Sequence, residues 1–170
     1  MASWLDYFAY GSNLHPRRLL ARAPSLQFRC TAWLGCHRLA FHKRGADGSG
    51  KADVKTGNPD DRVHGAIYRI SARDAARLDR IEGLGAGYLR KDVEVVTPDG
   101  PTPVFCYQAM PAWVLPGLLP FSWYRELVVA GALHHGLPDS YVGRIRSTPC
   151  EPDPDPVRAA AHRELLRGPD

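Results

Sequence analysis

The chain has 170 residues, of which 44% are hydrophobic and 24% charged, and its formal net charge is +4. This length and apolar content suit one domain with a single core. The apolar residues come in short runs, far from the ~20 that cross a bilayer, so we expect no membrane partner. Basic residues are interleaved with acidic ones, a scattered pattern that argues against a nucleic-acid partner.

The cysteines contain no Cys-x-x-Cys pair, so we expect free thiols or small core residues and no metal site. The first residues, Met-Ala-Ser-Trp-Leu-Asp, lack the basic and apolar regions of a secretory signal. We therefore expect a cytoplasmic protein, and the sequence is compatible with a monomer or a homodimer.

The first half of the chain predicts mainly β-structure. Alternating or continuous apolar residues indicate strands at 4–10, on both sides of a bend at Gly35 within 28–41, and at 52–56 and 63–70. A short helix is expected at 17–22, with Pro16 in its first turn and Ser12 or Asn13 as its cap.

The second half predicts more helix. The clearest helix runs from the cap residue Ser71 to Ile81 and ends at Gly83. A hairpin of strands 88–96 and 104–110 follows. Further helices are expected from a cap at Ser122 through Leu133, at 139–145 and, after a spacer rich in Pro and Asp, at 157–167.

The first candidate site is the turn Tyr10-Gly11-Ser12-Asn13, which lies between a strand and a helix. Backbone N–H groups and small polar side chains at such a junction can bind an anionic or carbonyl oxygen. The structural alternative is an ordinary turn, in which Gly11 supplies backbone freedom and Ser12 or Asn13 caps the helix.

The second candidate is Glu82, in the last turn of the clearest helix. The negative end of the helix dipole and partial burial both disfavour a charged carboxylate there, as suits a general base that accepts a proton from an ammonium. The alternative is a surface glutamate ahead of a glycine-rich loop. That loop reads Gly-x-Gly-x-Gly after a helix, which is neither the spacing nor the context of a dinucleotide site.

The order of these motifs resembles the γ-glutamylcyclotransferase family. The similarity runs from about Leu5 to Pro154 and includes Phe8-Ala9-Tyr10-Gly11-Ser12-Asn13-Leu14, Glu82-Gly83 with Gly87-Tyr88, Tyr107, Tyr124 with Ala130-Gly131-Ala132, and His135-Gly136-Leu137-Pro138. We therefore expect a γ-glutamylcyclotransferase-like domain at 1–155 and a C-terminal helical tail at 156–170.

The resemblance implies an α+β fold in which a small, mixed, mostly closed β-barrel carries flanking helices. It also implies a reaction in which the α-amino group of a γ-glutamyl unit attacks its own γ-carbonyl, so that 5-oxoproline forms and an amine or amino acid leaves. Glu82 matches the catalytic glutamate, as general acid and base. The expected substrate-binding residues are Tyr10, Gly11, Ser12, Asn13, Tyr88, Tyr107 and Tyr124. No cofactor and no metal is required, because the substrate carries the nucleophile.

Alternatives remain open at this point. One is a non-catalytic module of the same fold that binds a small ligand, and another is removal of a γ-glutamyl protecting group in secondary-metabolite biosynthesis. The resemblance disfavours glutathione as the dedicated substrate, because that branch of the family carries leucine where this chain has Asn13.

Overall fold

The computed structural model describes residues 3–167, so 1–2 of the predicted domain and 168–170 of the predicted tail lie outside the described residues. Its strands are β1 (Trp4–Ala9), β2 (Gln27–Gly35), β3 (His37–Arg44), β4 (Gly50–Thr56), β5 (Arg62–Ser71), β6 (Tyr88–Thr97) and β7 (Gly100–Ala109). Its α-helices are α1 (Pro16–Arg22), α2 (Ala72–Glu82), α3 (Ser122–His134), α4 (Asp139–Arg146) and α5 (Pro156–Arg163), with 3-10 turns η1 (Ser12–Leu14) and η2 (Pro111–Trp113).

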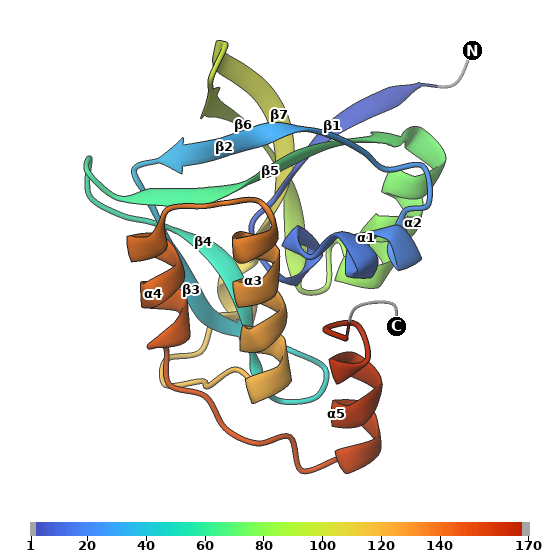
Figure 1. The fold of residues 1–170 in the computed structure, drawn as a ribbon, viewed down its shortest axis with the longest axis vertical. Helices are drawn as coiled ribbons and strands as arrows, with labels where there is room; N and C mark the ends of the chain where they lie inside the picture. The colour runs from blue at the N-terminus through green and yellow to red at the C-terminus, as the bar shows by residue number, and fades with distance from the viewer. Residues whose placement is uncertain (1–2, 168–170) are drawn as a thin grey trace.

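Five strands close into a barrel in the order β1-β5-β2-β6-β7. Neighbouring strands run antiparallel except β1 and β7, whose parallel pairing of Tyr7 with Phe105 completes the ring. Strands β3 and β4 form a separate antiparallel pair. In Figure 1 α1 and α2 lie to one side of the barrel, and α3 and α4 lie below it. The predicted α+β barrel with flanking helices is confirmed.

Helix α2 begins and ends as the sequence predicts. The Ser71 hydroxyl accepts a hydrogen bond from the Asp74 N–H at 3.2 Å, and Gly83 adopts a left-handed conformation with φ 68° and ψ 52°. Leu78 is fully buried, whereas Ile81 from the same apolar stripe is 43% exposed. The last turn of α2 therefore reaches past the core, and it carries Glu82 with it.

The prediction for the start of α3 is wrong. Phe121, not Ser122, is the cap residue, and no side chain caps the helix. The reason is tertiary: the Ser122 N–H donates to the Glu151 carbonyl at 2.8 Å, so a distant loop supplies the acceptor that a cap would offer.

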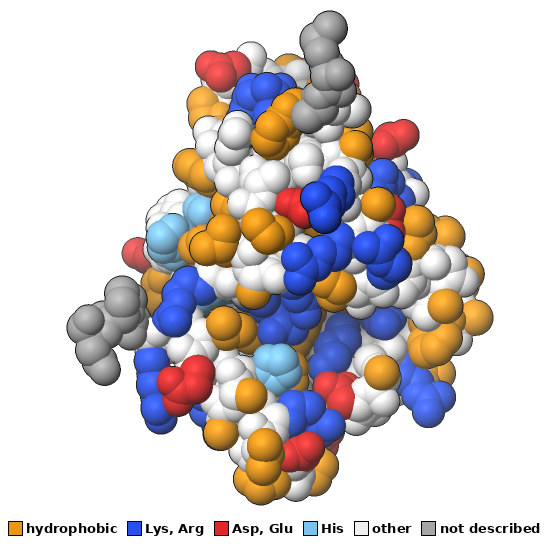
Figure 2. Space-filling view, turned by 90° about the vertical axis from the view of Figure 1, so that its right-hand side faces the viewer, with side chains coloured by type: hydrophobic (Ala, Val, Ile, Leu, Met, Phe, Trp, Pro, Cys, Tyr) orange, Lys and Arg blue, Asp and Glu red, His pale blue; other side chains and the backbone are white. Residues whose placement is uncertain are grey.

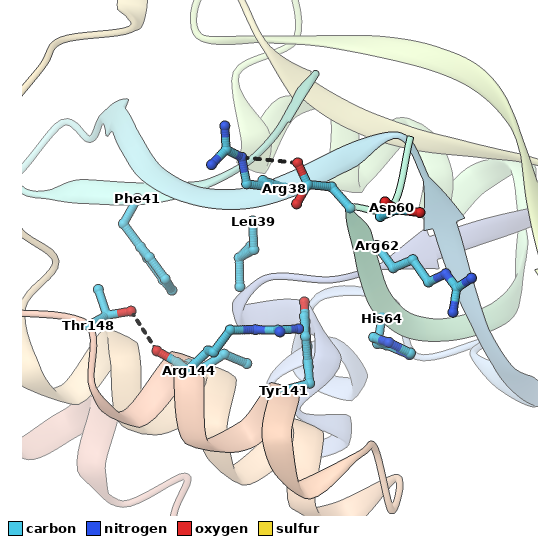
Figure 3. Close-up of a pocket in the computed structure, with 11 residues that line it drawn as sticks. Arg38, Leu39, Phe41, Asp60, Arg62, His64, Tyr141, Arg144 and Thr148 are labelled. Carbon is cyan, nitrogen blue, oxygen red and sulfur yellow. Dashed lines mark hydrogen bonds and ion pairs between the residues drawn. The ribbon is translucent and has the colours of Figure 1, made fainter. Parts of the chain in front are cut away.

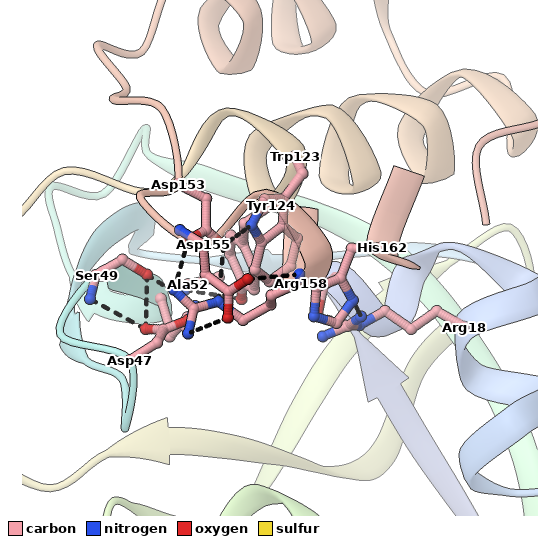
Figure 4. A network of polar contacts seen from close by, with 12 residues as sticks. Arg18, Asp47, Ser49, Ala52, Trp123, Tyr124, Asp153, Asp155, Arg158 and His162 are labelled. Atoms are coloured by element: carbon pink, nitrogen blue, oxygen red, sulfur yellow. Dashed lines mark hydrogen bonds and ion pairs between the residues drawn. The ribbon is translucent and has the colours of Figure 1, made fainter. Parts of the chain in front are cut away.

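Helix α5 packs on α3 and is shorter than the predicted 157–167. Asp155 caps it by accepting from the N–H groups of Val157 and Arg158, each at 3.0 Å. The imidazole of His162 stacks on the indole of Trp123, with ring centroids 3.8 Å apart. Figure 4 shows this helix joined to the rest of the chain by a network of polar contacts.

Two further expectations concern the chain as a whole. All four cysteines are free thiols, and Cys106 is buried, as expected. Within residues 3–167 no helix has both the length and the apolar character that a membrane span requires.

Candidate active site

The turn after β1 approaches β4 closely. A Cβ at position 11 would lie only 2.9 Å from the Cβ of Ala52 on β4, so glycine is required there for space. The backbone N–H groups of Gly11, Ser12 and Asn13 donate to no other described residue. The turn thus offers three available donors to a neighbouring oxygen.

Neither Ser12 nor Asn13 caps the following helix, so that expectation is wrong. The cap residue of α1 is His15, which makes no side-chain capping bond. The polar atoms of both predicted caps have other partners: the Ser12 hydroxyl accepts from Arg18 Nε at 3.0 Å. Asn13 Oδ1 accepts from Arg22 at 2.8 Å. Tertiary hydrogen bonds therefore occupy the side-chain oxygens that a local helix cap would use.

The carboxylate of Glu82 faces this turn across 69 residues of sequence. Its Oε1 accepts from Asn13 Nδ2 at 2.9 Å and from Arg22 at 3.1 Å, and the Glu82 side chain is only 16% exposed. Its Oε2 has no partner among the described residues. Glu82 is thus held in place by one oxygen and leaves the other available.

The four candidate tyrosines surround the same space, and three of their hydroxyls donate within the protein. Tyr10 donates to the Tyr107 carbonyl, Tyr88 donates to the Ala52 carbonyl at 2.6 Å, and Tyr107 donates to Asp79 Oδ1 at 2.7 Å. The Tyr124 hydroxyl instead accepts from the Ala52 N–H at 3.1 Å, which leaves its proton available. Burial raises the pKa of all four, so they remain neutral phenols.

Several residues at the site were missed by sequence reasoning: Tyr7, Arg18, Arg22, Lys43 and Ala52. Tyr7 accepts from Asn13 Nδ2 at 3.1 Å and lies deep in the barrel wall. One signal was available, because Arg18 and Arg22 lie four residues apart and so share one face of a helix. The other three come from strands whose sequence looks like ordinary core.

Two adjoining cavities make up the site. The inner cleft, of about 20 Å³, is lined by Tyr7, Tyr10, Gly11, Ser12, Asn13, Ala52, Glu82, Tyr88, Tyr107 and Tyr124. The outer cavity, of about 300 Å³, shares Ser12, Glu82, Tyr88 and Tyr124 and adds Arg18, Arg22, Lys43, Lys51 and Trp113 among others. All predicted site residues therefore line the inner cleft, and Glu82 stands where the two cavities meet.

A separate cavity of about 380 Å³ lies between β3, β5 and α4 (Figure 3). Its lining includes Arg38, Arg62, His64, Tyr141 and Arg144, and it contains none of the candidate site residues. Two carboxylates, those of Asp60 and Asp61, also line it, but the motifs that the sequence singled out lie at the other site.

Comparison with known proteins agrees with the motifs. The AIG2-like family matches residues 62–145. Gamma-glutamylcyclotransferase of Bos taurus is 31% identical over 148 residues, with coverage of 83% of this chain and 77% of the relative, and that of Mus musculus is 29% identical over 153 residues with the same coverage.

Solved structures agree as well. A structure of gamma-glutamyl cyclotransferase aligns with a TM-score of 0.86 at 25% identity, covering 98% of this chain and 100% of its own. An uncharacterised protein from Homo sapiens aligns with a TM-score of 0.85 at 25% identity, covering 96% of this chain and 99% of its own. With its barrel, its turn and these relatives, the chain belongs to the γ-glutamylcyclotransferase family.

Proposed function

We propose that the protein is a γ-glutamylcyclotransferase that converts a γ-glutamyl amine or amino acid to 5-oxoproline and the free amine. The observation that carries the proposal is the juxtaposition of the Glu82 carboxylate with the donors of the Gly11–Asn13 turn. Asn13 joins the two directly, through its 2.9 Å bond to Oε1. The relatives named above support the same reaction class.

In the proposed mechanism Glu82 Oε2 takes a proton from the α-ammonium of the substrate. The freed amine nitrogen bonds to the γ-carbonyl carbon and closes a five-membered ring, and negative charge develops on the carbonyl oxygen. Glu82 then passes its proton to the leaving nitrogen as the bond between that nitrogen and the γ-carbon breaks. The ring nitrogen loses its second proton to the same carboxylate, which passes it to the released amine, so the products are neutral-amide 5-oxoproline and an ammonium, and Glu82 ends ionised as it began. The nucleophile belongs to the substrate.

The inner cleft, at about 20 Å³ too small to enclose the glutamyl chain, favours this step by forming a fixed wall against which the chain bends. Its walls are aromatic and fixed by internal hydrogen bonds. The substrate therefore loses most of its conformational entropy on binding, before the ring closes. The backbone donors of the turn are placed to receive either the glutamyl carboxylate or the developing oxyanion. One such donor contributes roughly 10²–10³ in rate.

The test is to incubate the protein with γ-glutamyl amino acids, γ-glutamyl amines and glutathione, and to detect 5-oxoproline by mass spectrometry. We expect 5-oxoproline from at least one member of this panel. Calorimetric binding of these compounds without any product would instead identify a non-catalytic module and contradict the proposal.

A further inference from the structure

The outer cavity carries an excess of positive charge. Its lining holds Arg18, Arg22, Lys43 and Lys51, and its only acidic residue among those described is Glu82. The Asp47 carboxylate, which does not line the cavity, pairs with Lys51 Nζ at 2.7 Å and neutralises its charge. Four positive and two negative charges leave an excess of two. Figure 2 shows Lys and Arg side chains gathered around a hollow on the side of the molecule that carries α1, α2 and α5.

Lys43 is one of the two unneutralised cations. The residue is only 8% exposed, and its ammonium makes no ion pair or hydrogen bond with another described residue. Nζ lies 4.6 Å from the ring centroid of Tyr88 and 5.5 Å from that of Trp113, both of which line the outer cavity. A Cβ at Gly87 would lie 3.0 Å from Nζ, so the glycine makes room for this ammonium.

Arg18 is the other. The residue is 7% exposed, and its guanidinium bonds to Ser12 Oγ at 3.0 Å and to His162 Nδ1 at 3.1 Å, but to no carboxylate of a described residue. Burial, followed by Arg18 and Lys51, lowers the pKa of His162 to about 4, so this imidazole adds no charge at neutral pH. Figure 4 shows His162 of α5 beside Arg18. Burying a cation without a counter-ion is costly, which points to an anionic ligand as the missing partner.

The charge of the substrate then limits what the outer cavity accepts. A γ-glutamyl unit carries one carboxylate and one ammonium, so its net charge is zero and it leaves the excess of two unmatched. The inner cleft, of about 20 Å³, can take only part of that unit, so the remainder occupies the edge of the outer cavity next to Glu82 and adds no net charge there. The group that projects into the outer cavity is the leaving amine, which is acylated in the substrate and has no positive charge at its nitrogen.

We infer that the preferred leaving amine carries two negative charges, as an acidic amino acid or a phosphorylated amine does, and that Lys43 and Arg18 receive them. This inference rests on the proposed function and specifies the substrate class of the same site. A neutral amino acid supplies one charge and a simple amine supplies none, so both leave buried cations unpaired.

The test compares the kcat/KM of four substrates at low ionic strength: γ-glutamyl-aspartate, γ-glutamyl-phosphoethanolamine, γ-glutamyl-asparagine and γ-glutamyl-ethanolamine. We expect the aspartate and phosphoethanolamine compounds to exceed the asparagine compound by about tenfold or more, since a charged hydrogen bond contributes at least that much. The ethanolamine compound should be slowest. A preference for only one of the two dianionic compounds would assign the site to carboxylates or to phosphate.

Equal rates with the asparagine and aspartate compounds would overturn the inference while leaving the proposed function intact. Absence of 5-oxoproline from all four, and from the broader panel above, would contradict the proposed function itself. The two failures are therefore distinguishable.

Variants test whether the preference for dianionic leaving groups depends on Lys43. Lys43→Gln should collapse the ratio of aspartate to asparagine turnover toward one, whereas Lys55→Gln removes the same charge from an exposed position of β4 and should keep the ratio. Gly87→Ala retains Lys43 but displaces its ammonium, and it should lower the ratio in the same direction. An unchanged ratio in both folded variants of the outer cavity would overturn the role of Lys43.

Discussion

The inner cleft and the outer cavity differ in how completely their polar groups are satisfied. In the inner cleft the hydroxyls of Tyr10, Tyr88 and Tyr107 already donate within the protein, and little free volume remains. In the outer cavity the ammonium of Lys43 lacks an anionic partner, and the volume is about 300 Å³. The inner cleft, whose polar groups are already hydrogen-bonded, suits the glutamyl group that every substrate shares. The outer cavity, with its unpaired charges, suits the leaving amine, which differs between substrates.

Glu82→Gln should have the largest effect and should not depend on the leaving group. The amide cannot accept the proton of the α-ammonium, so we expect kcat to fall by about 10²–10⁴ with every substrate. The measurement is 5-oxoproline formation under saturating substrate. Glu94→Gln, on the exposed face of β6, is the matched control and should turn over normally. Undiminished kcat in the Glu82 variant would remove this residue from the chemistry.

Asn13→Ala should come next, because it acts on the inner cleft through Glu82. The change deletes the bonds from Nδ2 to Glu82 and from Arg22 to Oδ1. We expect kcat to fall by about tenfold to a hundredfold, with KM less affected. If instead KM rises for dianionic substrates alone, Asn13 belongs functionally to the outer cavity and the division into two regions is misplaced.

Tyr124→Phe separates structural from functional roles, because this residue lines both regions. Loss of its hydroxyl leaves the buried N–H of Ala52 without an acceptor, which should lower the free energy of unfolding by about 1–3 kcal/mol. Urea denaturation measures this difference. Unchanged stability would mean that the hydroxyl does not hold β4, and its role would then lie with the substrate.

His162→Phe should have the smallest effect on turnover, since it removes one hydrogen bond to Arg18, and its main effect should be on the pH dependence of stability. The folded pKa of about 4 lies below the ordinary value near 6.5, so folding favours the neutral imidazole. The stabilisation is present above pH 6.5 and is lost as the pH falls toward 4. Phenylalanine keeps a ring against Trp123 but cannot titrate.

The measurement for this variant is Tm between pH 7.5 and 4.5. We expect the decline of Tm across that interval to be shallower for His162→Phe than for the natural chain. Parallel curves for the two proteins would show that His162 does not contribute to acid destabilisation.

Much of this fold was predictable because local signals and tertiary structure agree. Helix α2 carries both its cap Ser71 and its terminator Gly83 in sequence, so its last turn, and with it Glu82, could be located. The turn at Gly11 was identified by its residue types. The reason for the glycine was different, since the approach of Ala52 requires it rather than an unusual backbone angle.

The unpredicted parts depend on partners distant in sequence. Ser12 and Asn13 look like caps, but their side chains bind Arg18 and Arg22 instead. Lys43 looks like a polar residue on an ordinary strand, and only the packing of Tyr88 and Trp113 around it reveals a buried cation. Charge balance in a cavity is a property of several segments together, so no single motif encodes it.

The attachment of β4 to the inner cleft has an evolutionary consequence. Both polar groups of Ala52 that Tyr88 and Tyr124 hold are main-chain atoms, which every residue type except proline possesses. The hairpin of β3 and β4 also carries Lys43 and Lys51 toward the leaving group. Mutations can therefore exchange the hairpin's charged side chains while its anchorage persists, and related chains can diverge in the amine they release without rebuilding the barrel.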